Sequence, residues 1–332
     1  MKKFAALILA AAMMMSLAGC GGKQVEAAPP TDTTTVAVGA VIIARDDVPD
    51  DVVYAFVSDI FEKKADIAHA KAGELDLAFA SSVTSVPYHP GAAKYFAEKG
   101  MKVASVKSGA GGSGSAGEIT FATGGTGGTY YAFGTVIAGH ATANSAYTFT
   151  GIPGEGSKAN VLLLSSNDAQ MAFCQSDVMA YAFSGTNTFA TEGKVDCFSV
   201  VASLYMEQVQ IVTTNGAITS VADLKGKSVS VGAPGSGVYY NAVDVLAAYD
   251  MTLDDIKANY QDFNTSADSL ANGQIDAAFI VAGAPTTAVT QLVTTNPNTR
   301  LVTLDDDHIT KLLASSPYYS KNVIAKDVYF GS

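Results

Sequence analysis

Two glycine-rich turns offer the groups in this chain that are best suited to binding a small anion. The first is FATGGTGGTYY, residues 121–131, and the second is VSVGAPGSGVYYN, residues 229–241. Each follows a short run typical of a strand and precedes a run typical of a helix. Glycine lets a ligand approach the bare backbone, and the following helix directs unpaired N–H groups and a positive dipole end at it. Two such units predict that a small anion is gripped from two sides.

Neither turn carries the residues that nucleotide binding or nucleophilic catalysis needs. A phosphate-binding P-loop has a lysine and a hydroxyl residue after its last glycine, whereas Tyr130 and Tyr239 stand in those regions here. The spacing around Ser236 does not match the Gly-x-Ser-x-Gly turn of hydrolases. A secreted hydrolase, one alternative, would require a contact between Ser236 and His140. We expect instead a binding protein with no catalytic residues and no cofactor.

The remaining histidines and cysteines show no spacing typical of a metal site. His308 follows three aspartates, residues 305–307, and we interpret that run as an acidic turn that caps the next helix. Cys174 and Cys197 lie in apolar runs without a CxxC or Cys/His pattern, so no zinc site is expected. In an exported protein the two cysteines fit a disulfide and two buried thiols equally well. The sequence leaves that choice open.

The composition indicates a folded, acidic protein. The chain has 332 residues, of which 48% are hydrophobic and 15% charged, and a formal net charge of -11. This length is typical of two lobes, and the charge disfavours nucleic acid as a partner. Arginine is confined to Arg45 and Arg300. A bound carboxylate would therefore be held by amides, hydroxyls and tyrosines rather than by a guanidinium group.

The N-terminal segment is typical of an export signal. Lys2 and Lys3 precede an apolar run, residues 4–17, that ends in Leu-Ala-Gly followed by Cys20. This pattern resembles a bacterial lipobox, which implies cleavage before Cys20 and lipid attachment there; an ordinary cleaved signal is the alternative. We expect residues 1–19 to be a signal peptide and residues 20–32 a lipidated tether. The mature protein is expected in the periplasm or at the cell surface, anchored to the membrane by its lipid.

Strands and helices alternate along the rest of the chain. This order predicts α/β lobes with mainly parallel sheets, in which ligands bind at the carboxyl ends of strands. Both glycine turns fall at such ends. Residues 108–117 contain only Gly, Ser and Ala and are interpreted as a linker. We expect one lobe over residues 118–208, a second over 209–304 and a return segment over 305–332; residues 254–259 are expected to begin a helix.

At these turns the sequence resembles the TAXI family of solute-binding proteins that serve TRAP transporters. The matching motifs include ATGGTGGTYYAFG (122–134), QSDV (175–178), SLYMEQVQIV (203–212), SVADLKGKSVSVGAPGSG (220–237) and FIVAGAP (279–285). Val238 stands where the family often has threonine, and Ala132 replaces a common proline. The resemblance covers nearly all of residues 118–326.

The resemblance also covers TVAVGAVIIARDDV (35–48) and YHPGAAKYFAEKG (88–100). In the family these segments close the chain, whereas here they come first. The chain therefore resembles a circular permutant in which residues 33–107 are the family's C-terminal segment, shared between the lobes. Permutation is tolerated when the original ends are close and exposed. It predicts that residues 36–43 pair in the same lobe as residues 209–213.

The family implies a type II periplasmic-binding-protein fold, with two α/β lobes that close by a hinge on a ligand. It implies a small anionic solute, such as glutamate, glutamine or a 2-oxoglutarate-like compound, delivered by a monomer to a TRAP membrane permease. A sensor lipoprotein that presents its ligand to a receptor is the alternative. The ligand-binding residues carried over from the motifs are Thr129, Tyr130, Ser157, Asn160, Gln175, Ser176, Ser236, Gly237, Gly283 and Pro285.

Overall fold

The computed structural model describes residues 30–108 and 117–331. The expected signal peptide, the lipidation site Cys20 and residues 109–116 of the expected linker lie outside the described residues. None of the helices in the described ranges has the length and apolar character that crossing a membrane would take.

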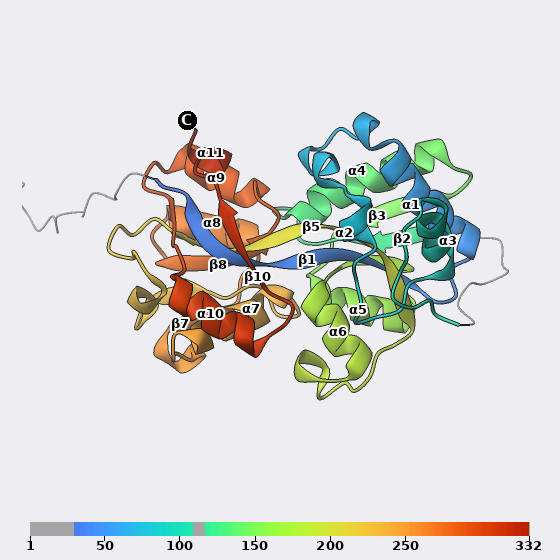
Figure 1. Ribbon diagram of the computed structural model, residues 1–332. Coiled ribbons are helices and arrows are strands. Elements are labelled where there is room, and N and C mark those ends of the chain that lie inside the picture. The colour runs from blue at the N-terminus through green and yellow to red at the C-terminus, as the bar shows by residue number, and fades with distance from the viewer. Residues whose placement is uncertain (1–29, 109–116, 332) are drawn as a thin grey trace, which may run out of the picture.

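Two lobes lie side by side and share one sheet (Figure 1). The strands are β1 (Thr33–Arg45), β2 (Glu118–Ala122), β3 (Thr148–Ile152), β4 (Met171–Gln175), β5 (Phe198–Thr213), β6 (Ser228–Ser230), β7 (Lys257–Asn259), β8 (Ala277–Ala282), β9 (Arg300–Leu301) and β10 (Ser320–Ile324). The α-helices are α1 (Asp50–Glu62), α2 (Leu77–Ala80), α3 (Pro90–Glu98), α4 (Thr129–Asn144), α5 (Ser157–Ser166), α6 (Ser176–Ser184), α7 (Gly237–Ala248), α8 (Phe263–Ala271), α9 (Thr287–Thr295), α10 (Asp306–Ser315) and α11 (Asp327–Phe330). Short 3₁₀ helices are η1 (Lys64–Asp66), η2 (Ala70–Glu74), η3 (Asn187–Phe189), η4 (Val221–Leu224) and η5 (Leu253–Asp255).

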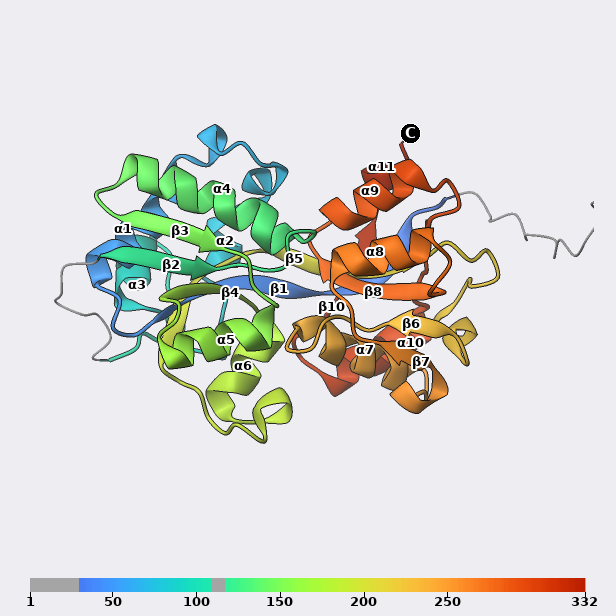
Figure 2. The ribbon, with the colours of Figure 1, turned by 180° about the vertical axis from the view of Figure 1, so that it is seen from behind.

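The first lobe contains β2–β4 and α1–α6, and the second contains β6–β10 and α7–α11 (Figures 1 and 2). The sheet order is β3-β2-β4-β1-β5-β8-β6-β7, with β10 paired to β1 and β9 to β5. The short strands within each lobe pair in parallel, β2 with β3 and β4, and β6 with β7 and β8. The long strands β1 and β5 are antiparallel to their neighbours, so the expectation of mainly parallel sheets holds only inside the lobes.

Strands β1 and β5 connect the two lobes. Residues 37–45 of β1 pair with residues 198–208 of β5, while residues 208–213 of β5 pair with β8 in the second lobe. Residues 36–43 were expected to pair in the same lobe as residues 209–213. Val36 and Val38 do pack in one core cluster with Val209 and Ile211, whereas residues 40–43 belong to the core of the first lobe. In the sequence, residues 198–204 and 209–213 look like separate strands. Glu207 and Gln208, which interrupt the apolar pattern, are in fact part of one continuous strand.

The cores of the two lobes differ in character. The first lobe is rich in aromatic rings: Phe173 stacks on Phe121 and on Tyr130, with ring centroids 5.2 and 4.6 Å apart. The second lobe is packed mainly by aliphatic side chains such as Val209, Val245 and Leu246, all fully buried. Rigid aromatic packing fixes the side chains that stand beside it. The stack on Phe173 thus holds the ring of Tyr130 in place at the start of α4.

Residues 254–259 do not begin a helix. Leu253–Asp255 forms a single 3₁₀ turn, closed by a capping box between Thr252 and Asp255. Shortly after this turn the chain forms β7, in which Lys257 pairs with Ser228 of β6. The acidic residues thus cap one turn only, and pairing with a neighbouring strand decides the conformation of residues 257–259.

Candidate ligand-binding site

A cavity of about 520 Å³ lies between the lobes. The first lobe contributes residues from the first glycine turn, the start of α5 and the carboxyl end of β4, and β5 contributes Glu207. The second lobe contributes the second glycine turn, residues 260–263 and the end of β8. A cavity of this size suits a small molecule bound between two lobes. Both glycine turns singled out in the sequence thus face the same space.

Three helices begin at the wall of this cavity. They are α4 after Gly128, α5 after Gly156 and α7 after Ser236. In the described structure none of the three N-caps accepts a side-chain hydrogen bond from its own first turn. The Oγ of Ser236, a residue well suited to capping, instead donates to the carbonyl of Ala233 at 2.7 Å. First-turn amides and the positive dipole ends of three helices are therefore directed at the cavity wall.

The start of α7 meets the end of β4 across the cavity. A Cβ placed on Gly237 would lie 1.7 Å from the Oε1 of Gln175, so only glycine permits this approach. Beside it, Gly156 has a φ of 108° and faces Ser236. The amide nitrogen of Ala159 donates to the carbonyl of Gly235 at 3.1 Å. These contacts close one side of the cavity and bring the starts of α5 and α7 together.

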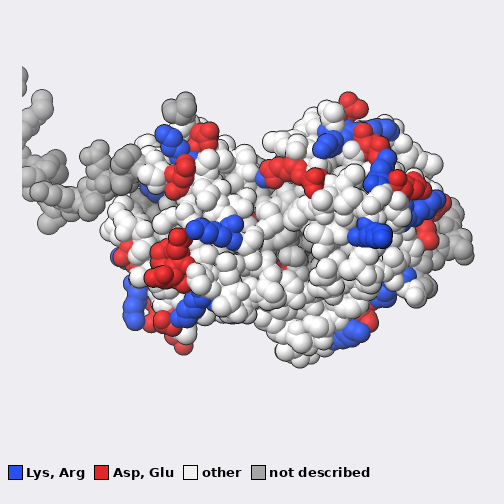
Figure 3. Space-filling view, in the orientation of Figure 1, with Lys and Arg blue, Asp and Glu red and all other residues white. Residues whose placement is uncertain are grey.

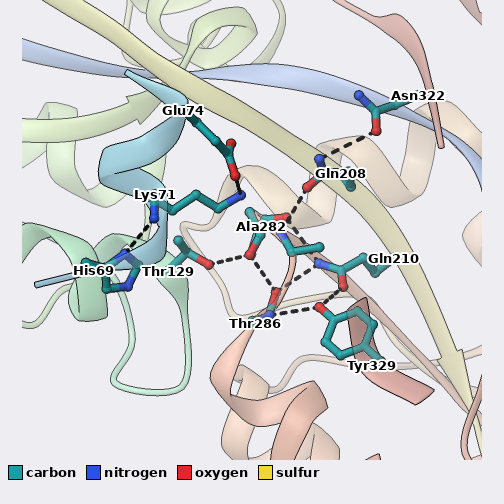
Figure 4. A network of polar contacts seen from close by, with 12 residues as sticks. His69, Lys71, Glu74, Thr129, Gln208, Gln210, Ala282, Thr286, Asn322 and Tyr329 are labelled. Atoms are coloured by element: carbon teal, nitrogen blue, oxygen red, sulfur yellow. Dashed lines mark hydrogen bonds and ion pairs between the residues drawn. The ribbon is translucent and has the colours of Figure 1, made fainter. Parts of the chain in front are cut away.

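Hydrogen bonds between the lobes close the opposite side. The Oγ1 of Thr129 donates to the carbonyl of Gly283 at 2.7 Å, and the amide of Ala288 donates to the carbonyl of Gly127 at 3.1 Å. Figure 4 shows Thr129 pointing from α4 towards the chain beside Ala282. Thr286 also donates to Gly283, at 3.1 Å. The lobes thus touch on both sides of the cavity.

Gln175 presents a buried acceptor that no described residue satisfies. Its side chain is 2% exposed and its Nε2 donates to the Oδ1 of Asn241 at 3.0 Å, but its Oε1 has no partner within the described structure. Asn241 in turn donates to Asp177 at 3.1 Å and to Tyr319 at 2.7 Å. Burial raises the pKa of Asp177 to about 6. An unsatisfied buried acceptor is costly, and this one is enclosed where β4 meets the start of α7.

Glu207 is a buried carboxyl group in the cavity wall. It is 2% exposed, and its Oε2 accepts a hydrogen bond from the Oη of Tyr130 at 2.6 Å. Burial raises the pKa of Glu207 to about 8, with a further increase from nearby Asp177, whereas Tyr130 and Lys71 lower it. The position of Tyr130 on Phe173 fixes the direction of this hydrogen bond. Glu207 was not among the predicted site residues.

Lys71 is the nearest buried cation, but it faces another carboxylate. Its Nζ lies 2.6 Å from the Oε1 of Glu74 and 5.3 Å from the centre of the Tyr205 ring. Figure 4 shows this pair near Thr129, whose Oγ1 donates to the carbonyl of Gly283. Among the described residues that line the cavity there is neither a lysine nor an arginine. An anion in the cavity would therefore meet amides and hydroxyl groups.

Six of the ten predicted site residues line the cavity, and four lie behind it. The six are Thr129, Tyr130, Ser157, Gln175, Ser236 and Gly237. Asn160 is fully buried and donates to the carbonyls of Thr123 and Phe173, at 2.6 and 2.8 Å. These bonds hold the start of α5 against β2 and β4.

The other three residues behind the wall have contacts that position it. The Oγ of Ser176 accepts from the amide of Gly39 at 3.0 Å and so fixes α6 on β1. Gly283 offers its carbonyl to Thr129, and Pro285 follows a cis peptide bond after Ala284. Direct ligand contact stays a prediction for all ten residues. In addition to Glu207, sequence reasoning missed Glu155 and residues 260–263 of the wall.

The geometry is unfavourable for the hydrolase alternative. The Nδ1 of His140 lies 2.6 Å from the Oδ2 of Asp59, inside the first lobe, while Ser236 donates to Ala233.

Within the described ranges no three His, Cys, Asp or Glu side chains gather as a metal site. Cys174 and Cys197 are both free thiols, the first buried and the second partly exposed.

Comparison with known protein families assigns the chain to one of them. The profile of the NMT1-like family matches residues 23–100 and 121–332, and the chain belongs to this family.

Similar solved structures include three binding proteins. The alkanesulfonate-binding protein SsuA from Xanthomonas axonopodis pv. citri, bound to MOPS, is 16% identical with a TM-score of 0.39 over 57% of this chain and 61% of that chain. SsuA from Escherichia coli is 16% identical with a TM-score of 0.35, over 57% and 60%. An ancestral arginine-binding protein bound to arginine is 15% identical with a TM-score of 0.38, over 57% and 79%.

The chain thus spans about 60% of the length of the SsuA proteins. The expected fold class, two α/β lobes with a ligand cleft between them, is confirmed by the topology and by the cavity between the lobes.

Proposed function

We propose that this protein is an extracytoplasmic solute-binding protein that captures a small anionic solute between its lobes. The observation that carries the proposal is the convergence of three helix N-termini, without side-chain caps, on one cavity between two lobes. Backbone amides at helix starts are effective anion ligands at short range. The net charge of -11 does not oppose this, because the dipoles act over a few Å.

A carboxylate of amino-acid size fits this wall best. The helix starts favour an acceptor such as a carboxylate, and the carboxyl group of Glu207 can form a hydrogen bond with a second polar group of the solute. Glutamate and glutamine carry both a carboxylate, which accepts hydrogen bonds, and an ammonium group, which donates them. A 2-oxoglutarate-like compound carries the accepting carboxylates only. Binding would stabilise the closed arrangement relative to an open one, and the protein would perform no chemistry on its ligand.

Calorimetric titration with amino acids and dicarboxylates tests this proposal. We expect one solute to bind per chain, and we expect Ser157→Ala or Ser236→Ala to weaken binding severalfold. Turnover of a substrate in the absence of any binding to acidic solutes would contradict the proposal. A control, Ser315→Ala in α10, changes a hydroxyl that bonds only Leu312 and should leave affinity unchanged.

We further propose that the protein is a lipoprotein, attached through Cys20, that delivers its solute to a TRAP-type permease. The support is the lipobox-like sequence before Cys20 and the TAXI motifs around both glycine turns. Cys20→Ala is expected to release the protein from the membrane fraction without loss of solute binding. Uptake by cells that have the permease but lack this protein would contradict the delivery role.

We also propose that the chain is circularly permuted, so that residues 33–107 correspond to the family's C-terminal part. In support, β10 pairs with β1 as neighbouring antiparallel strands, Ile324 opposite Thr33, and the amide of Lys326 donates to Asp32 at 2.9 Å. The family match is also interrupted between residues 101 and 120. A chain reordered to run from 118 to 326 and then from 32 to 107 should melt cooperatively and bind the same solute. Failure of that chain to fold would contradict the permutation.

A further inference from the structure

Three carboxyl groups line the cavity among the described residues, and Glu207 alone is buried, whereas Glu155 and Asp262 are exposed. An anion-binding role does not explain this buried carboxyl group. A site built only for a carboxylate would not place a second carboxyl group in its wall, because two negative charges in a buried space repel each other. Glu207 is 2% exposed, and within the described residues it takes part in no ion pair. Its only recorded hydrogen bond joins Oε2 to Tyr130, and its Oε1 has no donor in the described structure.

The surroundings of Glu207 supply no cation of their own. The titratable groups that face it are Tyr130 on α4, Tyr205 on its own strand, Lys71 on η2, Asp177 on α6 and Cys174 on β4. Lys71 is the only one of these that carries positive charge, and its Nζ is bound by Glu74 at 2.6 Å. Buried charges in proteins are stable when they are paired. Without such a pair the Glu207 carboxyl group stays protonated near neutral pH, because burial raises its pKa to about 8, and it is stable as a carboxylate only if a cation from outside the chain pairs with it.

The cavity thus has two chemically distinct parts. The helix starts of α4, α5 and α7 offer donors, whereas Glu207 offers a carboxyl group that accepts once it is ionised. A solute that bears a carboxylate and an ammonium group complements both parts, while a dicarboxylate complements only one. An ammonium group has three donors, one of which could serve the Glu207 carboxylate.

We propose that Glu207 determines specificity by accepting a hydrogen bond from an ammonium group of the solute, so that the site takes amino carboxylates in preference to dicarboxylates. This inference rests on the proposed function. In the empty site Glu207 holds its proton near neutral pH, because burial raises its pKa to about 8. When the ammonium group arrives, the carboxyl proton leaves to solvent and the ammonium keeps its own charge. Binding then releases about one proton per solute at pH 7.

The test is calorimetry at pH 7 in two buffers of different ionisation enthalpy, with L-glutamate, L-glutamine, glutarate and 2-oxoglutarate as titrants. The amino acids are expected to bind at least tenfold more tightly than the two dicarboxylates and to release about one proton each. Proton release is measured on the unaltered protein, so this result does not depend on any variant folding. Binding of all four solutes with equal affinity and no proton release would overturn the inference and leave the proposed function standing.

Two variants sharpen the test. Glu207→Gln keeps the size of the side chain and should weaken amino-acid binding by roughly tenfold or more, abolish proton release and leave glutarate binding unchanged or stronger. Glu98→Gln is the matched control, since the Oε2 of Glu98 also accepts from a tyrosine, Tyr54, at 2.7 Å, but on the exposed surface. If Glu207→Gln binds amino acids as the unaltered protein does, the inference is wrong. If none of the four solutes binds, the proposed function fails and the inference fails with it.

Discussion

Gly237 and Gln175 meet across the cavity so closely that a Cβ on Gly237 would lie 1.7 Å from the Oε1 of Gln175. The first residue belongs to α7 in the second lobe and the second to β4 in the first. The absence of a side chain at one position therefore sets how near the lobes can come. Contact between lobes is part of the site, because the cavity exists only when both walls are in place.

Gly237→Ala is expected to hinder closure. The added methyl group has no space beside Gln175, and overpacking of this kind costs about 1–3 kcal/mol. We expect solute affinity to fall roughly tenfold or more with little change in the melting temperature of the empty protein. Titration calorimetry measures the affinity, and small-angle scattering with saturating solute measures closure.

Gly139→Ala is the control for that variant. A Cβ at Gly139 would meet nothing within 4 Å, and the residue lies inside helix α4. Alanine should stabilise the helix by about 0.5–1 kcal/mol and leave affinity unchanged. Equal affinities for the two variants would show that the contact with Gln175 does not limit closure.

Thr129→Val removes a hydrogen bond between the lobes. The Oγ1 of Thr129 donates to Gly283 at 2.7 Å in a buried setting, but Thr286 continues to donate to the same carbonyl. The loss should therefore be modest, about 0.5–1.5 kcal/mol, seen as a three- to tenfold weaker affinity in calorimetry. Thr135→Val changes only a bond inside α4, to Tyr131, and should not alter binding. If Thr135→Val weakened binding more than Thr129→Val does, the hydrogen bond from Thr129 to Gly283 would not be what supports affinity.

The empty protein should lose stability as the pH rises from about 5 to 8. Glu207 has a pKa of about 8 in the folded state, above that of an unfolded glutamate, so the folded state holds more protons across that window. This contribution to the free energy of unfolding is complete below the pKa that Glu207 has in the unfolded chain. It is lost as the pH rises through the pKa that Glu207 has in the folded state. Asp177, with a pKa of about 6, adds to the loss at the lower end of the window.

Calorimetric melting from pH 5 to pH 9 without solute checks this prediction. Glu207→Gln should flatten the decline above pH 6, because an amide does not titrate there. An unaltered slope in this variant would mean that other groups cause the decline.

Association with an anionic solute should become faster as salt is added. The net charge of -11 repels an anion at long range, and Figure 3 shows acidic residues as well as basic ones over both lobes. Salt screens this repulsion over about 8–10 Å, while the short-range dipoles of the helix starts are little affected. Stopped-flow measurements at low and high ionic strength give the rate. An association rate that falls as salt is added would instead indicate that the anion is attracted electrostatically on its way to the cavity.

The sequence was sufficient to locate the two glycine turns that form part of the cavity wall. Glycine turns between a strand and a helix have a strong local signal, and both are found where the sequence placed them, with α4 beginning at Thr129 and α7 at Gly237. Asn160 and Ser176, which are predicted ligand contacts, do not line the cavity in this structure; their hydrogen bonds hold α5 and α6 in place. Sequence motifs identify residues at or near a binding site. They do not distinguish residues that line the cavity from residues that hold the lining in place.

Long-range pairing was the part that local patterns could not show. Glu207 breaks the apolar run of β5 and suggests two short strands, although it is buried and paired with Tyr130, 77 residues away in sequence. A charged residue within an apolar run was the available signal for a functional group. The role of this charged residue could not be inferred from the sequence, because the cavity beside it is formed only in the folded chain.

The position of β1 has a consequence for folding order. This strand takes partners from β4, β5 and β10, so segments separated by nearly 300 residues must meet before the sheet is complete. Non-local pairing of this kind slows folding, because loop-closure entropy is lost before the contacts form. A nascent chain that has passed β1 but not β10 has no finished sheet to fold into. Such a chain would stay incompletely folded until its synthesis nears completion.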